Sequence, residues 1–251
     1  MVAIAIGGVQ PPIGGLEVLS PDPFVIWQLG VQSNDAIRAG DWWRIITPIF
    51  LHLGLIHVVM NCVLAWITGR WLEADFGSVR LVVIYLASGI AGFILSYYVN
   101  IGGAGASGAV SGLMGAVLVR RRLVDGDFRD PNTIWVLQLI GLNVILGFSI
   151  EGVNNYAHGG GFVTGALLAY IFTRVPMGRG GDAAVSIVAA ALVAATVAAF
   201  VFMGLNLGST SPDEALALSR CFDKTPAVLV DGGRGVNPRA GRDQLTCLED
   251  N

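Results

Sequence analysis

Six apolar stretches, each long enough to cross a lipid bilayer as a helix, limit most strongly what this chain can fold into. A hydrocarbon core about 30 Å thick needs roughly 20 apolar residues in helical conformation. With 54% hydrophobic and only 13% charged residues, the chain has too little polar surface for a water-soluble protein. We therefore predict an all-α fold, a polytopic bundle of membrane helices. The expected spans are residues 45–68, 81–99, 101–119, 133–150, 156–172 and 183–207.

The third stretch differs from the others because it opens with the glycine-rich segment IGGAGASG. Such a segment is typical of a loop, so we expect the helix to begin at about Ser107. The first backbone N–H groups of a helix have no partner within it and can donate to an anion. The hydroxyl of Ser107 is therefore expected at a helix N-terminus, a position that suits the nucleophile of an acyl-transfer reaction.

The connecting segments differ in charge, which predicts the orientation of the bundle. Loops 100–106 and 151–155 contain no Lys or Arg. The other connections carry Arg70, Arg80, Arg120, Arg121, Arg122, Arg129, Arg174 and Arg179. By the positive-inside rule these arginines face the cytoplasm. The region before Trp43, the two neutral loops and the segment after Leu207 then face outward.

Composition also disfavours several classes of protein and site. A formal net charge of −3 offers no basic surface for nucleic acid. Residues 1–8 lack the basic region and cleavage site of a signal peptide. The three histidines have no supporting carboxylate or cysteine at ligand spacing, so we expect no metal and no cofactor.

The three cysteines divide by their surroundings. Cys62 lies in an apolar stretch, where the expected role is that of a small buried hydrophobic residue. Cys221 and Cys247 lie in the polar carboxy-terminal segment and can form a disulfide if that segment faces an oxidising compartment. This crosslink would contribute about 3 kcal/mol in the chain-entropy treatment. Alkylation of both thiols without prior reduction would exclude it.

The amino-terminal segment has two interpretations. Residues 1–8, MVAIAIGG, are apolar but too short to span the bilayer, so they are either the end of a truncated helix or a genuine outward-facing terminus. We favour truncation, which amino-terminal sequencing of the native protein would test. The expected organisation is a truncated helix end with an outer loop (1–43), a catalytic core (44–175), a cytoplasmic linker with an additional helix (176–207) and a polar extracytoplasmic tail (208–251).

Polar side chains inside the bilayer are costly, so those present are candidates for function. All three histidines, His52 included, lie in or beside spans. His57 and Asn61 are one turn apart in the first span, Ser107 begins the third and His158 begins the fifth. These three spans cross in the same direction, so the residues near their beginnings lie toward the same outer leaflet.

Small residues allow the third and fifth helices to approach each other. Ser107, Ser111 and Gly115 recur every four positions on the third, while Gly161 and Gly165 follow the histidine on the fifth. Such spacing permits close helix contact in a membrane, and with it a hydrogen bond between the hydroxyl and the imidazole.

The chemistry of peptide cleavage then suggests a role for each residue. His158 would accept the proton of Ser107 as the hydroxyl attacks the scissile carbonyl, and would return it to the leaving amine. His57, Asn61 and the Ser107 backbone N–H would donate hydrogen bonds to the oxyanion. The spans hold no carboxylate at this depth, and Glu151 is the nearest in an outer loop, so a dyad is simpler than a triad.

Each of these residues also has a purely structural interpretation. A serine in a glycine-rich membrane helix is usually a packing residue, and an HxxxN pair can bond between helices. A histidine at a helix start can be interfacial. Their joint occurrence on one leaflet favours the catalytic interpretation.

In this order, the residues resemble the rhomboid family of intramembrane proteases. The resemblance covers about residues 43–174 and depends on four ordered motifs. The motifs are Trp43-Arg44, HLGLIHVVMN at 52–61, Gly105-Ala106-Ser107-Gly108, and AHGGGFVTG at 157–165, which contains Gly161 and Gly165. Each motif is weak alone, whereas the ordered set is specific.

The resemblance implies a serine endopeptidase with a Ser107–His158 dyad and with His57 and Asn61 at the oxyanion site. Its partners would be the lipid bilayer and protein substrates, cut in transmembrane segments of weak helicity near the outer leaflet. The expected location is a bacterial plasma membrane. The remaining motif residues would support the structure: Trp43, Arg44, Gly105, Gly108, Gly161 and Gly165.

The resemblance also raises two structural points. It implies a helix before the Trp-Arg pair, so that the full form would have a six-helix core plus the helix at 183–207. Many members have an aromatic residue four positions after the nucleophile, packed on the histidine, whereas this chain has Ser111. That exchange bears on the orientation of His158 and on the width of the pocket.

Two other functions compete with proteolysis. An inactive rhomboid-like protein would bind membrane segments without cutting them, which the intact Ser107 and His158 disfavour. A small channel or transporter would line a water-filled path with His52, His57 and His158. The pattern shows no inverted repeat and no carboxylate within the spans, which disfavours transport.

Overall fold

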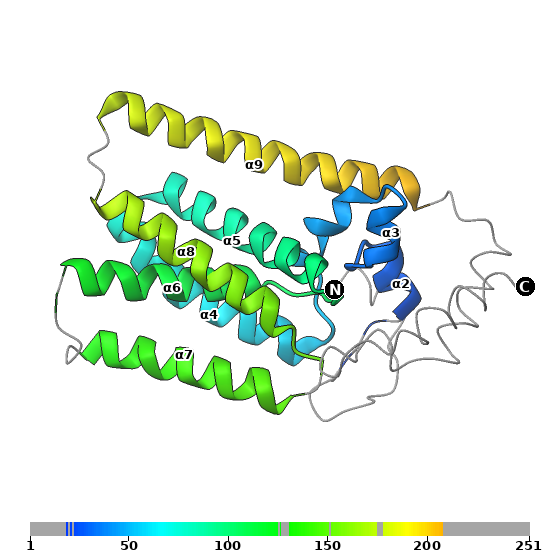
Figure 1. Cartoon of the computed structure of the whole chain (residues 1–251), viewed down its shortest axis with the longest axis horizontal. Coiled ribbons are helices and arrows are strands. Elements are labelled where there is room, and N and C mark those ends of the chain that lie inside the picture. The colour runs from blue at the N-terminus through cyan, green and yellow to red at the C-terminus, as the bar shows by residue number, and fades with distance from the viewer. Residues whose placement is uncertain are drawn as a thin grey trace, which may run out of the picture.

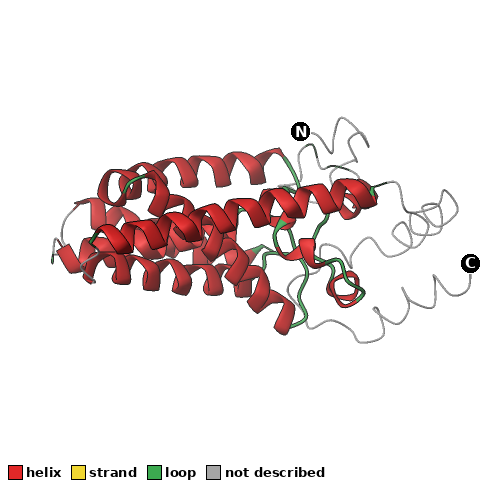
Figure 2. Ribbon diagram, turned by 90° about the horizontal axis from the view of Figure 1, so that it is seen from above, coloured by secondary structure: helices red, strands yellow, loops and turns green. Residues whose placement is uncertain are grey.

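The computed structural model describes residues 19, 21, 23–124, 126, 131–150, 152–174 and 178–207, and within them it is helical. In Figure 2 the described elements are helices joined by loops, and an isolated antiparallel bridge pairs Gln32 with Gly103. The elements are α2 (Pro23–Gln28), α3 (Asn34–Arg38), two 3₁₀ turns, η1 (Trp42–Ile45) and η2 (Thr47–Phe50), and then α4 (Leu55–Phe76), α5 (Ser78–Tyr98), α6 (Ser107–Val124), α7 (Pro131–Ser149), α8 (Asn155–Arg174) and α9 (Arg179–Asn206).

Helix α6 is the centre of the bundle. Every residue from Gly108 to Val117 is buried, and α6 contacts α4, α5, α7 and, most extensively, α8. Helices α7 and α9 lie at opposite edges, and the short helices α2 and α3 lie together at one end (Figure 1). The all-α membrane bundle predicted from the apolar stretches is confirmed.

Only part of the bundle has the hydropathy of lipid-facing helices. By length and composition, α4, α5 and α9 are long and apolar enough to cross a membrane, and α7 contains a shorter apolar helix, Thr133–Ser149. Helices α6 and α8 are rich in glycine and form the seam at the centre. Because protein surrounds α6, that helix does not need an apolar surface against lipid.

The seam between α6 and α8 is a contact of backbone on backbone. A Cβ placed on Gly161 would overlap the carbonyl of Gly108, and one on Gly165 would overlap the carbonyl of Gly112. A Cβ on Gly115 would likewise overlap the carbonyl of Phe162. Any side chain at these positions would therefore separate the two helices.

The predicted first span, residues 45–68, was wrong at both ends. Residues 42–50 form the two 3₁₀ turns, and α4 begins only at Leu55 and continues to Phe76. Pro48 interrupts the early part because it has no N–H to donate and restricts the residue before it. The other predicted spans agree with α5 to α9 within a few residues at most ends, and α6 begins at Ser107 as expected.

Arg44 holds together the segment that precedes α4, residues 23–50 (the outer segment). Its guanidinium donates to Asp41 at 2.8 Å and to the backbone carbonyls of Trp27 at 2.7 Å and Val31 at 3.1 Å. The same group lies over the ring of Trp27, 4.5 Å from its centroid. Burial lowers the pKa of the Arg44 guanidinium from its ordinary value, while the bond to Asp41 acts in the opposite direction.

Aromatic side chains join α9 to the same outer segment. Phe202 stacks on Trp43 with ring centroids 6.2 Å apart and meets Trp42 edge to face. Phe200 meets Phe50 edge to face at 5.4 Å. The additional helix is thus part of the packing at this end of the bundle.

Three expectations about individual segments have different outcomes. Cys62 was expected to be buried and is instead exposed on α4. Residues 1–8, and Cys221 and Cys247 in the segment 208–251, lie outside the described residues. The truncation and the disulfide remain predictions.

Candidate active site

Ser107 and His158 meet at one end of the α6–α8 seam. Ser107 is the first residue of α6, and His158 lies in the first turn of α8. The Oγ of Ser107 and the Nε2 of His158 are 2.7 Å apart, within hydrogen-bonding distance. A hydroxyl bonded to an imidazole at a helix N-terminus has the geometry of a nucleophile with its base.

Gly105 brings the loop before Ser107 close to α4. Its φ of +139° is a conformation that glycine adopts readily and other residues rarely do. A Cβ on Gly105 would lie 2.8 Å from Cε1 and Nε2 of His57 and 3.6 Å from the Oγ of Ser107. The backbone N–H of Gly105 donates to the carbonyl of Pro48 at 2.9 Å, which fixes this approach.

His57 lies beside this loop with a defined tautomer. The Nδ1 of His57 accepts a hydrogen bond from the backbone N–H of Leu53 at 3.4 Å. A neutral imidazole whose Nδ1 accepts carries its proton on Nε2. The Nε2–H of His57 is therefore a donor on the side of the ring that faces Gly105.

Asn61 follows His57 by one turn and is buried. Its Nδ2 donates to the carbonyl of His57 in its own helix at 2.9 Å. A carboxamide nitrogen has two hydrogens, so this bond leaves the second available to another acceptor.

His52 lies next to His57, although no role in peptide cleavage was predicted for it. Its ring meets that of His57 edge to face, with centroids 5.2 Å apart, and its Nε2 is buried without a hydrogen-bond partner among the described residues. The two histidines lie five residues apart in HLGLIH, on opposite sides of Gly54, the residue before α4. Only the bend before α4 brings the rings together, so the spacing carried no clear signal.

Ser111 lies one turn below Ser107 on α6 and is 3% exposed. Its hydroxyl has no hydrogen-bond partner in the part of the chain that the structure describes. The bond between Ser107 and His158 forms with serine at this position, so an aromatic residue is not required for that orientation of the imidazole.

Two ion pairs lie toward the end of the bundle away from Ser107 and His158. Arg120 pairs with Asp75, and Arg80 pairs with Asp182. Ser107 and His158 lie at the amino-terminal ends of their helices, whereas Arg120 and Arg174 lie toward the carboxy-terminal ends. Within the described ranges no group of three or more His, Cys, Asp or Glu could hold a metal ion.

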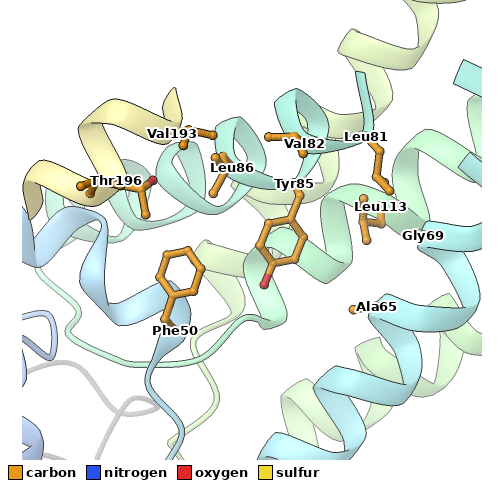
Figure 3. Close-up of a pocket in the computed structure, with 11 residues that line it drawn as sticks. Phe50, Ala65, Gly69, Leu81, Val82, Tyr85, Leu86, Leu113, Val193 and Thr196 are labelled. Carbon is orange, nitrogen blue, oxygen red and sulfur yellow. The ribbon is translucent and has the colours of Figure 1, made fainter. Parts of the chain in front are cut away.

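A separate apolar cavity of about 410 Å³ lies between α4, α5, α6 and α9. The aromatic ring of Tyr85 projects into it from α5, and Phe50 and Leu113 form part of its wall (Figure 3). Ser107, His158, His57 and Asn61 do not line this cavity. It therefore does not enlarge the candidate site.

Comparison with known proteins gives a consistent set of similarities. A family model described as the Rhomboid domain matches residues 39–175, more than half of the chain. Rhomboid protease GluP of Bacillus subtilis (strain 168) is 33% identical over 178 residues, which are 70% of this chain and 34% of that protein. The putative rhomboid protease YdcA of the same organism is 33% identical over 158 residues, 59% of this chain and 76% of that protein.

A plant relative is similar to the same extent. RHOMBOID-like protein 6, mitochondrial, of Arabidopsis thaliana is 38% identical over 171 residues, 66% of this chain and 55% of that protein. The chain thus spans 34% of the length of GluP and 55% of the length of the plant protein.

Proposed function

This chain belongs to the rhomboid family and is an integral membrane protein, and we propose that it is a serine endopeptidase that cleaves transmembrane segments of other proteins. The observation that carries the proposal is the 2.7 Å contact between Ser107 Oγ and His158 Nε2 at the start of two closely packed helices. The family relationship supports a membrane protease in general, and this contact suggests which residues act.

In the proposed reaction, Ser107 Oγ attacks the carbonyl carbon of the scissile peptide bond. His158 Nε2 accepts the hydroxyl proton as the new C–O bond forms and then donates it to the departing amine as the C–N bond breaks. Water then attacks the acyl-serine ester, with His158 again acting as the base, and this step releases the new carboxyl group. His158 ends each cycle neutral, so no further carboxylate is needed for proton balance.

The oxyanion of the tetrahedral intermediate would lie between α4 and the first turn of α6. The Nε2–H of His57 and the free amide hydrogen of Asn61 are the side-chain donors that the geometry supports, and the backbone N–H of Ser107 is a third. Donors that are already held in place stabilise developing charge without reorganising during the reaction.

The location of the site suggests its substrates. The dyad lies at the end of the bundle opposite Arg80, Arg120 and Arg174, which by the positive-inside rule is the extracytoplasmic end. We propose a location in a bacterial plasma membrane and substrates whose membrane helices are locally weak near the outer leaflet, because an intact helix keeps its carbonyls bonded. Within the chain, we propose residues 44–175 as the catalytic core, preceded by a helix end and outer loop (1–43) and followed by a linker with α9 (176–207) and an outer tail (208–251).

Cleavage of a single-span model protein by purified protein in liposomes tests this function. We expect Ser107→Ala and His158→Ala to lower kcat by roughly 10³-fold or more, because each removes one half of the proton transfer. Ser186→Ala is a matched control, since that serine lies on α9 and bonds only to the carbonyl of Asp182.

Other outcomes would point to other functions. Binding of the substrate without cleavage by the wild-type protein would favour an inactive binding protein. Cleavage that persists in Ser107→Ala would mean a different nucleophile. Ion or solute flux through the liposomes without cleavage would favour a channel or transporter.

A further inference from the structure

We infer that Asn154 is a positioning residue, whose side chain joins the loop before Ser107 to the first turn of the helix that carries His158. The inference depends on the proposed function, because it concerns the geometry of the same dyad. Asn154 lies immediately before α8, four residues before His158. Its side-chain hydrogen bonds go to Ser96, Gly102 and Ala157, and thus to neither member of the dyad.

The carboxamide oxygen of Asn154 caps α8. The backbone N–H of Ala157 donates to Oδ1 at 3.0 Å, and the N–H of His158 donates to the backbone carbonyl of Asn154 at 3.2 Å. This is the geometry of an N-cap residue, which satisfies one of the unpaired donors of a helix. Because a backbone N–H can only donate, the contact with Ala157 also fixes which side of the carboxamide is oxygen.

The carboxamide nitrogen faces the other way, toward the loop that leads to Ser107. Nδ2 donates to the carbonyl of Gly102 at 3.3 Å and to the Oγ of Ser96 at the end of α5. Ser96 is fully buried and donates in turn to the carbonyl of Ile101 at 2.8 Å. A Cβ on Gly103 would lie 3.3 Å from Nδ2, which shows how closely the loop approaches.

The opposite side of this loop is held by a different element. Gln32 donates from its backbone N–H to the carbonyl of Gly103 at 3.1 Å and from Nε2 to the carbonyl of Phe93 at 2.9 Å. The loop 101–106 therefore lies between the outer segment and α8, and Asn154 supplies the direct side-chain link to α8. The glycine seam sets the spacing of α6 and α8 along their length, and Asn154 sets it at the reacting end.

Only a carboxamide can make this set of contacts. Aspartate keeps the acceptor for Ala157 but has no hydrogen to donate to Gly102 or Ser96. Alanine loses both functions. The Asn154→Asp variant thus separates capping of α8 from the link to the loop.

Asn155 is a matched control one position along the chain. Its Nδ2 donates to the carbonyl of Gly147 in α7 at 2.8 Å, so it joins α8 to a helix that carries no member of the dyad. Asn155→Ala removes the same side chain and one helix–helix bond without affecting the loop before Ser107.

The experiment measures kcat, KM and thermal stability for wild type, Asn154→Ala, Asn154→Asp and Asn155→Ala in the liposome assay. We expect Asn154→Ala and Asn154→Asp to lower kcat about 10- to 100-fold with little change in KM, because a displacement of about 1 Å is costly at a reacting centre. Asn154→Asp should retain the melting temperature better than Asn154→Ala. A wild-type kcat for Asn154→Asp would mean that Asn154 is only a helix cap, and would overturn the inference.

Hydrogen exchange of the loop 101–106 tests the link without relying on proteolysis. Both Asn154 variants should exchange faster than wild type in this loop, and Asn155→Ala should not. Unchanged exchange in the Asn154 variants would overturn the inference even if the wild type cleaves. Faster exchange in a wild-type protein that cleaves nothing would support the link and reject the proposed protease.

Discussion

Helices α7 and α8 both pack on α6, but they are held in different ways. At the α6–α8 seam, glycines bring backbone against backbone, so the distance between the two axes has almost no freedom. Helix α7 contacts α6 less extensively, and large side chains such as Ile145 and Phe148 are 62% and 79% exposed. The candidate dyad is carried by the seam, where a small error in spacing would separate its two atoms.

The largest expected effect comes from a methyl group in the seam. Gly165→Ala places a Cβ into the carbonyl of Gly112, and backbone cannot move aside as a side chain can. We expect a loss of about 3 kcal/mol of stability and at least about a 100-fold loss of cleavage. Gly141→Ala is the control on α7, where a Cβ meets nothing within 4 Å.

Thermal unfolding and cleavage assays on these two variants test the comparison directly. Gly141→Ala should match or slightly exceed wild-type stability, since alanine favours a helix over glycine by about 1 kcal/mol. Equal behaviour of Gly165→Ala and Gly141→Ala would mean that the seam is not held by close backbone contact.

A core truncation should have an intermediate effect. Leu113 on α6 is 1% exposed and packs within the central cluster, so Leu113→Ala removes packing contacts and enlarges the apolar cavity that Leu113 lines. We expect a loss of about 2 kcal/mol, measured as the shift in the midpoint of unfolding in mixed detergent. Ile145→Ala on the exposed face of α7 should change that midpoint little, and a comparable loss there would show that α7 is packed as tightly as the centre.

The smallest effect concerns the carboxy-terminal end of α7. Asn155→Ala removes the bond to the carbonyl of Gly147, a neutral hydrogen bond that contributes about 1 kcal/mol. Hydrogen exchange should rise in the last turns of α7 while kcat stays near that of wild type. A large loss of kcat would show that α7 and the dyad are more closely coupled than their packing indicates.

Much of the architecture could be predicted from patterns in the chain. Apolar length predicted the helices, and the glycines before Ser107 marked the start of α6. The orientation inferred from the arginines stays a prediction. The beginning of α4 was misjudged, because residues 45–54 are as apolar as the helix that follows and only Pro48 and Gly54 mark the irregular turns. Hydropathy measures only the free energy of transfer to lipid. A buried turn can be as apolar as a helix, so hydropathy does not distinguish the two.

The contacts of the site were less accessible to prediction. The direction of each span placed His57, Asn61, Ser107 and His158 toward one leaflet, but direction says nothing about lateral distance. Asn154 was not singled out at all, because an asparagine before a helix is common and its second role depends on a loop more than 50 residues away. His52 was left without a role in peptide cleavage for a related reason, since its contact with His57 depends on the bend before α4.

By itself the amino-acid sequence determined that this chain is a membrane helix bundle, and it predicted which way the bundle faces and which few polar side chains lie near one leaflet. These properties follow from the transfer energies of individual residues and add along the chain. Only the tertiary structure decided that the oxygen of Ser107 and the nitrogen of His158 are 2.7 Å apart. That distance depends on how closely two helix backbones can approach, and on loops whose hydrogen bonds join residues far apart in the chain.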